Sequence, residues 1–291
     1  MATFRQRLER GLKTSSKRFL RANAALKRRF GRRGHCLFVT AMPRSASTFL
    51  TRSLAELTGF LPFFLGTDHH NEQDLYLPAL IDSYTMDVVA HQHTRATERN
   101  LAFMGEFGIE PVILVRNLPD ALVSLCDHLS REARASPLFA PPAGFRALPY
   151  DKRLAITLDM TLPWYVQFYA GWERAAAETG RRILWLSYDE LALRPVDAFR
   201  RVLEFYRLPA PPEPALRALA LHVPARGDVR FNVGRPGRGA EAFTGAQLAR
   251  IRETLEDCHL MLRAAPHLEM VLPVAGDAAA AGAATPLRRL G

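Results

Sequence analysis

Residues 36–48 read Cys-Leu-Phe-Val-Thr-Ala-Met-Pro-Arg-Ser-Ala-Ser-Thr, and this stretch decides the fold class. Its first part, residues 36–42, is an apolar, β-branched run whose length is typical of a buried strand. Beyond residue 48, phenylalanine and leucine recur at helical spacing as far as Gly59. The sequence therefore predicts a buried strand that turns directly into a helix at residues 43–48.

The predicted turn has the composition of a phosphate-binding loop. The first N–H groups of a helix have no partner within the helix, and the helix dipole adds partial positive charge there. Hydroxyl side chains and an arginine, with its fork of N–H donors, supply further contacts for an anion. An ordinary Ser/Thr N-cap on a buried helix is the alternative explanation. The candidate phosphate-binding residues are Arg44, Ser45, Ala46, Ser47 and Thr48.

Strand-like runs alternate with helical patterns along the rest of the chain. Further strands are predicted at residues 87–93, 111–115 and 183–188. The alternation predicts an α/β fold of three layers, in which a mainly parallel central sheet is covered by helices on both faces. Such sheets bind ligands at the carboxyl ends of their strands. Helices are predicted from Pro119 and at residues 151–179, 195–206, 213–221 and 244–263.

The basic charge of the chain is concentrated at one end. The 291 residues carry a net charge of +10, but residues 1–34 contain twelve Lys and Arg against one Glu, a net charge of +11. The remaining 257 residues carry 27 basic and 28 acidic side chains. The expected organisation is a basic extension over residues 1–34, one domain over residues 35–272, and a disordered Ala/Gly-rich tail over residues 273–291.

The role of the basic extension has several readings. An imperfect apolar stripe makes residues 1–34 a candidate amphipathic helix for an anionic membrane surface or a polyanion. A disordered solubilising tail and an organellar transit peptide are alternatives. Dedicated nucleic-acid binding is not expected, because no recognition motif or aromatic platform accompanies the charge.

The cysteine content and the lack of long apolar segments indicate in which cellular compartment the protein is expected. Cys36, Cys126 and Cys258 are few and far apart, which argues for a reducing compartment and against a disulfide framework or a thiolate metal site. No run of about 18 apolar residues occurs, so no transmembrane helix is predicted. The first residues lack the apolar core of a secretory signal. A cytoplasmic location is expected, with any membrane contact at the periphery. Nothing in the sequence indicates the oligomeric state.

Four motifs, in order, resemble the sulfotransferases that use 3′-phosphoadenylyl sulfate (PAPS). The first is residues 43–48, and the second is residues 116–124, Arg-Asn-Leu-Pro-Asp-Ala-Leu-Val-Ser. The third is residues 184–191, Leu-Trp-Leu-Ser-Tyr-Asp-Glu-Leu, and the fourth is residues 231–238, Phe-Asn-Val-Gly-Arg-Pro-Gly-Arg. The resemblance extends from about residue 37 to residue 251. It implies transfer of a sulfuryl group from PAPS to an acceptor hydroxyl, with release of adenosine 3′,5′-bisphosphate (PAP) and no required metal.

The resemblance assigns the phosphate groups of PAPS to different motifs. Residues 44–48 would hold the 5′-phosphosulfate, and Arg116 with Ser124 would hold the 3′-phosphate. Tyr188 would lie beside the adenine, and Gly234 belongs to a late cofactor-binding loop. An ordinary surface salt bridge to Asp120 is the alternative reading of Arg116. A nucleotide-dependent kinase is a weaker match, because the glycines and Lys of a P-loop and a strand-end Asp for magnesium are absent.

Sulfuryl transfer to a hydroxyl needs a base for the acceptor proton and cations for the leaving phosphate. Many family members have Lys-Thr-His at the end of the second strand, where this chain has residues 91–93, His-Gln-His. His93 matches the base, and His91 replaces the Lys, so Arg44 has to carry more of the charge. The two histidines share one face of the predicted strand. Glu72 is the rival base, because other branches use a Glu at this distance after the phosphate loop. An exposed histidine pair or a metal chelate is the alternative.

The expected acceptor is a saccharide hydroxyl on a glycan, a glycolipid or a sugar-bearing metabolite. Ala46, where most of the family has Gly, and the His-x-His pattern both lean toward carbohydrate-acting branches; a lipid or a small aromatic alcohol is the alternative. At Ala46 the turn has either to avoid positive φ or to bear strain. Gly239 stands near a position where many members have Trp. A second hypothesis is a non-catalytic protein that docks on a polyanion or membrane through a degenerate sulfotransferase fold.

Overall fold

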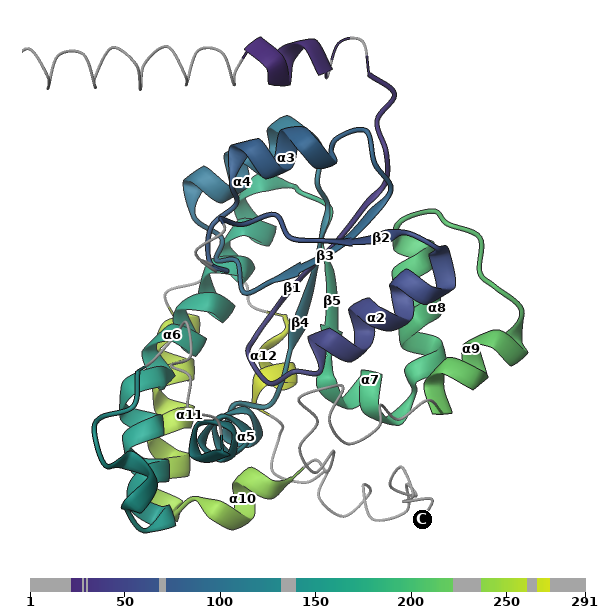
Figure 1. The fold of residues 1–291 in the computed structure, drawn as a ribbon. Coiled ribbons are helices and arrows are strands. Elements are labelled where there is room, and N and C mark those ends of the chain that lie inside the picture. Colours follow the sequence, from purple (N-terminus) through teal and green to yellow (C-terminus); the bar gives the residue numbers. More distant parts are fainter. Residues whose placement is uncertain are drawn as a thin grey trace, which may run out of the picture.

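The structure is a computed structural model that describes residues 22–27, 29, 31–67, 72–131, 140–221, 237–260 and 266–272. Its centre is a five-stranded, wholly parallel sheet with the strand order β2-β3-β1-β4-β5 (Figure 1). The parallel α/β architecture predicted from the sequence is therefore confirmed. The strands are β1 (Cys36–Ala41), β2 (Leu61–Phe63), β3 (Val88–Gln92), β4 (Pro111–Val115) and β5 (Leu184–Ser187).

Helices cover both faces of this sheet (Figure 1). α2, α8 and α9 lie over one face, and α4, α5, α6 and α11 lie over the other. The helices are α2 (Ser47–Thr58), α3 (Leu77–Ser83), α4 (Glu98–Phe107), α5 (Leu118–Arg131), α6 (Tyr150–Thr179), α7 (Tyr188–Leu193), α8 (Pro195–Phe205), α9 (Glu213–Leu221), α10 (Arg238–Ala242), α11 (Gly245–Leu260) and α12 (Leu268–Val271), with a 3₁₀ turn η1 (Phe145–Ala147).

The central strand is apolar on both sides because both sides are covered. Leu37 and Val39 of β1 pack in the core under α2 and α8, together with Phe199. Phe38, which points the other way, joins the core under α6 that contains Trp172. Successive residues of a strand alternate between faces, so an unbroken apolar run fits a strand buried between two helical layers.

The strands predicted from the sequence need two corrections. The strand predicted at residues 183–188 ends at Ser187, whose side-chain oxygen accepts the N–H of Glu190 at 3.0 Å and caps α7. Tyr188 is therefore the first residue of a helix. Strand β2 was not predicted, because three residues at the edge of the sheet are too few to show a period.

The chain leaves β1 and β3 toward opposite faces of the sheet. These strands are neighbours, with Val39 opposite His91 and Thr40 opposite Gln92. α2, which follows β1, covers one face, and α4, which follows β3, covers the other. Loops that diverge in this way open a crevice at the carboxyl ends of the strands, where ligands of open α/β sheets bind.

Part of the segment before β1 packs against the domain. Residues 22–27 are helical, and Ala24 is buried in the core. The Lys27 ammonium donates to the carbonyl oxygen of Ile81 at 3.0 Å, and the Gly34 N–H donates to that of Tyr84 at 3.0 Å. Residues 1–21 and the tail at 273–291 lie outside the described residues, so the predictions for them stay predictions. In the described ranges, no helix is long and apolar enough to cross a membrane.

Candidate functional site

The turn between β1 and α2 has an unusual backbone. Arg44 and Ala46 both have left-handed conformations, with φ of 69° and 64°. Ala46 is the residue that precedes α2, and no side chain caps this helix. The alternative of an ordinary Ser/Thr N-cap is therefore wrong. The turn bears strain at Ala46, because a side chain in the left-handed region crowds the following carbonyl oxygen.

Buried polar atoms surround this turn. The Tyr165 hydroxyl of α6 donates to the Pro43 carbonyl oxygen at 3.1 Å, and both groups are buried. Ser45 is fully buried, and its hydroxyl has no hydrogen-bond partner among the described residues. An unpaired buried hydroxyl costs free energy. A ligand atom that accepts a hydrogen bond from the Ser45 hydroxyl would remove this cost.

The second predicted phosphate motif lies directly against the first. Arg116 follows β4, and its Nη1 donates to the Arg44 carbonyl oxygen at 2.9 Å. The Arg44 Nε donates to the Ser124 hydroxyl of α5 at 3.3 Å. Arg116 is buried, and its Nε has no partner in the described part of the chain. The structure thus brings together residues 72 and 80 positions apart in one basic, donor-rich corner.

Asp120 links Arg116 to the backbone at residues 237 and 239, at the end of the fourth sequence motif. Its carboxylate lies 3.8 Å from Arg116, and both side chains are buried, so this is not a surface salt bridge. The same carboxylate accepts the backbone N–H groups of Gly237 and Gly239 at 2.8 and 2.7 Å. A Cβ at Gly239 would lie 2.3 Å from the Cβ of Pro119, so this position has no room for a side chain. Gly234 and the rest of residues 231–236 lie outside the described residues.

Tyr188 lies beneath Arg116. The guanidinium carbon is 3.8 Å from the centre of the tyrosine ring. Burial raises the pKa of the Tyr188 hydroxyl, although the charge of Arg116 opposes the shift. Stacking on an aromatic face fixes the guanidinium plane and leaves its edge for hydrogen bonds. Contact between Tyr188 and an adenine stays a prediction.

His91 is a partly buried, neutral residue. Its Nε2 lies 2.8 Å from the Ser47 hydroxyl in the first turn of α2. Burial, and secondarily the charge of His93, lowers the pKa of His91 to about 3. His91 therefore contacts the Ser47 hydroxyl as a neutral side chain.

His93 lies beside Glu72, the rival candidate for the same role. Its ring is 5.4 Å from that of His91 and nearly perpendicular to it. The His93 Nδ1 lies 2.7 Å from the Ala41 carbonyl oxygen, which can only accept, so this nitrogen carries the proton. The Nε2 lies 3.3 Å from a Glu72 carboxylate oxygen. The two candidate bases are therefore one contacting pair at the carboxyl end of β3.

Sequence reasoning missed three contacts that shape the site. The first is the hydrogen bond from Tyr165 to the Pro43 carbonyl oxygen, and the second is the contact between His91 and Ser47. The third is the pair of hydrogen bonds that Asp120 accepts from backbone N–H groups at the start of α10. The only signal for the first was the aromatic spacing within α6, which is equally typical of core packing. Across the described ranges, no three His, Cys, Asp or Glu side chains gather as they would around a metal ion.

Comparison with solved structures identifies the architecture. No protein-family model matches the sequence, and no curated protein matches it. The mouse sulfotransferase SULT7A1, complexed with PAP, is similar with a TM-score of 0.60 and 15% sequence identity, over 84% of this chain and 89% of that one. The chain has the sulfotransferase fold.

Retinol dehydratase shares this sulfotransferase fold. Its complex with androsterone and the inactive cofactor PAP matches with a TM-score of 0.55 and 13% identity, over 84% of this chain and 86% of that one. Its complex with retinol and PAP matches with a TM-score of 0.53 and 14% identity, over 85% of this chain and 87% of that one. These likenesses agree with the fold implied by the four sequence motifs.

Proposed function

We propose that the protein is a PAPS-dependent sulfotransferase that moves a sulfuryl group to an acceptor hydroxyl and releases PAP. The observation that carries this proposal is the junction of two anion-binding motifs, in which Arg44 contacts both Ser124 and the side chain of Arg116. A nucleotide with phosphate groups on both sides of its ribose needs two such neighbouring sites. The buried Ser45 hydroxyl and Arg116 Nε, which have no partner among the residues that the structure describes, suit phosphate oxygens.

Residues 44–48 would hold the phosphosulfate, and Arg116 with Ser124 would hold the 3′-phosphate. When bound, PAPS supplies the activated sulfuryl group. The Arg44 guanidinium and the first N–H groups of α2 stabilise the negative charge that grows on the leaving phosphate. His91, neutral and bonded to Ser47, orients that hydroxyl toward the anion.

His93 is the proposed base, and Glu72 is its partner. Because the Nδ1 proton is donated to the Ala41 carbonyl oxygen, the Nε2 of a neutral His93 carries the lone pair that accepts the hydroxyl proton. The histidine becomes positively charged as it accepts that proton. A Glu72 carboxylate at 3.3 Å stabilises this charge. An acceptor hydroxyl that binds at the mouth of this pair would be activated there.

Ligand-induced stabilisation tests the nucleotide assignment. PAP at about 100 times its Kd should stabilise the protein by about 2.7 kcal/mol, which is roughly 5–10 °C in Tm for a chain of this size. ATP with magnesium should give a much smaller shift, because it lacks a 3′-phosphate. Ser124→Ala should reduce the PAP shift, whereas Ser130→Ala, on the same helix α5, should not. Equal stabilisation by ATP–magnesium would favour a kinase instead.

Turnover with PAPS tests the base. His93→Ala should lower kcat by about 10²–10⁴ with little change in the Kd for PAP, since a base acts on the transition state. Glu72→Gln should cost about 10–100-fold, the value of one charge-assisted hydrogen bond. If Glu72→Gln abolishes turnover and His93→Ala retains most of it, the roles are reversed. Any detectable transfer by the wild type, lost in Arg44→Ala, excludes the non-catalytic docking hypothesis.

A saccharide hydroxyl is the proposed acceptor class. Support comes from Ala46 and from the His91 and His93 pair, which resemble carbohydrate-acting branches. A screen with labelled PAPS against glycans, glycolipids, sterols, retinoids and phenols would test it. Transfer confined to sterols, retinoids or phenols would refute the saccharide assignment and leave sulfuryl transfer intact.

A further inference from the structure

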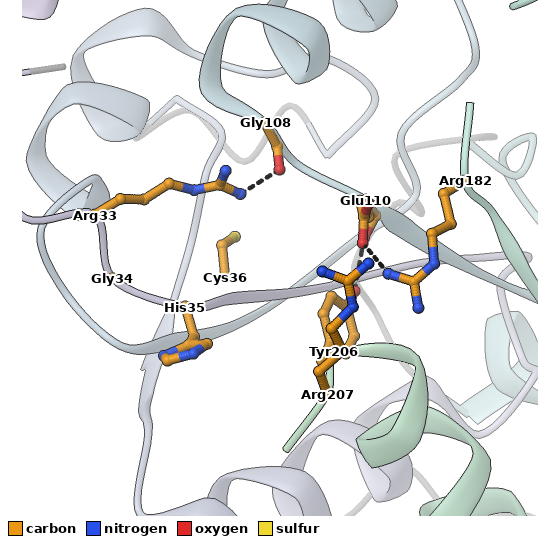
Figure 2. A pocket seen from close by; sticks show the side chains of 9 residues that line it. All are labelled: Arg33, Gly34, His35, Cys36, Gly108, Glu110, Arg182, Tyr206 and Arg207. Carbon is orange, nitrogen blue, oxygen red and sulfur yellow. Dashed lines mark hydrogen bonds and ion pairs between the residues drawn. The ribbon is translucent and has the colours of Figure 1, made fainter. Parts of the chain in front are cut away.

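A polar cleft lies at the amino-terminal edge of the sheet, at the other end of β1 from the phosphate loop (Figure 2). It has a volume of about 250 Å³ and is lined by residues 33–36, by residues 108 and 110, and by Arg182, Tyr206 and Arg207. β1 is six residues long, so the cleft and the phosphate loop are about 20 Å apart. The cleft is therefore separate from the site described above.

Hydrogen bonds make the floor of the cleft rigid. The Tyr206 hydroxyl accepts the N–H of Phe38 at 2.9 Å and donates to the Glu110 carbonyl oxygen at 2.8 Å. Arg182 pairs with the Glu110 carboxylate at 2.7 Å and donates to the Phe205 carbonyl oxygen at 2.5 Å. These contacts join β1 and the end of α8 to the residues that precede β4 and β5, so the shape of the cleft is formed without a ligand.

The lining has more positive than negative charge. Arg33, Arg182 and Arg207 stand against one carboxylate, Glu110, a net charge of +2 when His35 is neutral. Arg182 forms an ion pair with the Glu110 carboxylate, and Arg33 donates to the carbonyl oxygen of Gly108 (Figure 2). Within the described residues, neither Arg33 nor Arg207 has a carboxylate partner. A second carboxylate, Asp87, contacts the lining residue His35 at 2.9 Å and does not contact either arginine.

Arg207 occupies a position where the backbone favours glycine. Its φ is 56°, and its N–H donates to the Glu204 carbonyl oxygen, while the Leu208 N–H donates to that of Leu203, both at 2.9 Å. This is a common C-terminal helix cap, in which the left-handed residue is usually glycine. A side chain there strains the backbone, and such strain is typically kept where the residue has a function.

We propose that this cleft binds a phosphate monoester, as a second anion site independent of the nucleotide site. Guanidinium groups donate paired hydrogen bonds to phosphate oxygens, and a dianion would balance the net charge of the lining. Arg207 and Arg33 are the anion-binding residues. The phosphate group reaches the cleft either on a free metabolite or on the headgroup of a lipid such as phosphatidic acid.

Titration of the ¹⁵N-labelled full chain with inorganic phosphate, followed by amide NMR, tests this site locally. The amides of Gly34 and Gly108 should shift in a saturable way, and those of Ser45 and Ala46 report the phosphate loop separately. Arg207→Gly should raise the Kd read from Gly34 and Gly108 by about 5–10-fold, while Tm stays equal to or above that of the wild type, because glycine suits the backbone. Arg174→Gln, an exposed arginine on α6, is the matched control and should leave this Kd unchanged.

Vesicle binding separates the two sources of phosphate. Phosphatidylcholine vesicles with and without phosphatidic acid are compared for the wild type, Arg207→Gly and Arg33→Gln. Loss of vesicle binding in both variants assigns the cleft to a lipid headgroup, whereas loss of free-phosphate binding alone assigns it to a soluble ligand. The proposal is overturned if the Gly34 and Gly108 amides do not shift, or if both variants bind phosphate as the wild type does.

Discussion

At the scale of single residues, the proposed phosphate loop has a backbone conformation that does not suit its side chains. Ala46 has a φ of 64°, which costs a non-glycine residue about 1–2 kcal/mol. Ala46→Gly should therefore raise the free energy of unfolding, by about 0.5–1 kcal/mol once the greater freedom of glycine in the unfolded chain is subtracted. Urea denaturation measures this change.

An alanine within the helix that follows Ala46 provides the control. Ala55 lies within α2 in ordinary helical backbone, so Ala55→Gly should lower the free energy of unfolding by about 1 kcal/mol. The two substitutions are chemically identical and should have opposite signs. If both destabilise the protein equally, the left-handed conformation at residue 46 is not the one that the folded protein adopts.

His91 makes stability depend on pH. Its pKa is lowered to about 3 in the folded protein, mainly by burial, against an ordinary value of 6.5. The unfolded chain therefore binds a proton between pH 6.5 and 3 that the folded protein does not, so stability falls as pH falls through this window. Between pH 8 and pH 5 this one group should cost about 2 kcal/mol.

Denaturation curves at the two pH values measure this loss, and His91→Gln isolates it. Glutamine can still bond to Ser47 but does not titrate, so the variant should lose less stability on acidification than the wild type. An identical loss in both proteins would mean that other groups cause the acid sensitivity.

At the scale of elements, close contact between α5 and α10 positions the late loop. Gly239 leaves no space for a Cβ, which would lie 2.3 Å from that of Pro119 and 2.5 Å from its backbone carbon. Gly239→Ala should destabilise the protein by about 1–3 kcal/mol through overpacking, and should weaken PAP binding by moving α10 away from Asp120. Thermal unfolding and the Kd for PAP measure the two effects.

Gly245 gives the comparison for this prediction. It begins α11, and nothing lies within 4 Å of a Cβ built on it. Gly245→Ala should leave the Kd for PAP unchanged and should alter stability by no more than about 1 kcal/mol, upward if at all. Equal losses at the two glycines would contradict the contact between α5 and α10.

At the scale of the whole molecule, the structure bears on where the domain begins. Ala24 is buried in the core, and Lys27 donates to Ile81, although both precede the expected boundary at residue 35. A chain that starts at residue 31 should be about 1–2 kcal/mol less stable than one that starts at residue 22, because it loses that packing and that hydrogen bond. If the two shortened chains have equal free energies of unfolding, the domain begins at residue 35, as the sequence predicts.

The sequence by itself determined the layers of the fold and predicted a candidate site at the turn after β1. Apolar runs of strand length predicted β1, β3, β4 and most of β5, because a strand buried on both sides leaves a local pattern. The small, hydroxyl and basic residues after β1 predicted a phosphate-binding loop, because these residue types stand next to one another in the sequence. Each of these inferences needs only residues that are close together in the chain.

The tertiary structure decided everything that depends on distant residues. It joined Arg44 to Ser124, placed Glu72 against His93, and desolvated His91 enough to lower its pKa. Burial and contact depend on how loops from β1, β3 and β4 converge at one edge of the sheet, and no local pattern records that convergence. The left-handed backbone at Ala46 belongs here too, since the surrounding packing, including the bond between Tyr165 and Pro43, holds a conformation that alanine alone disfavours.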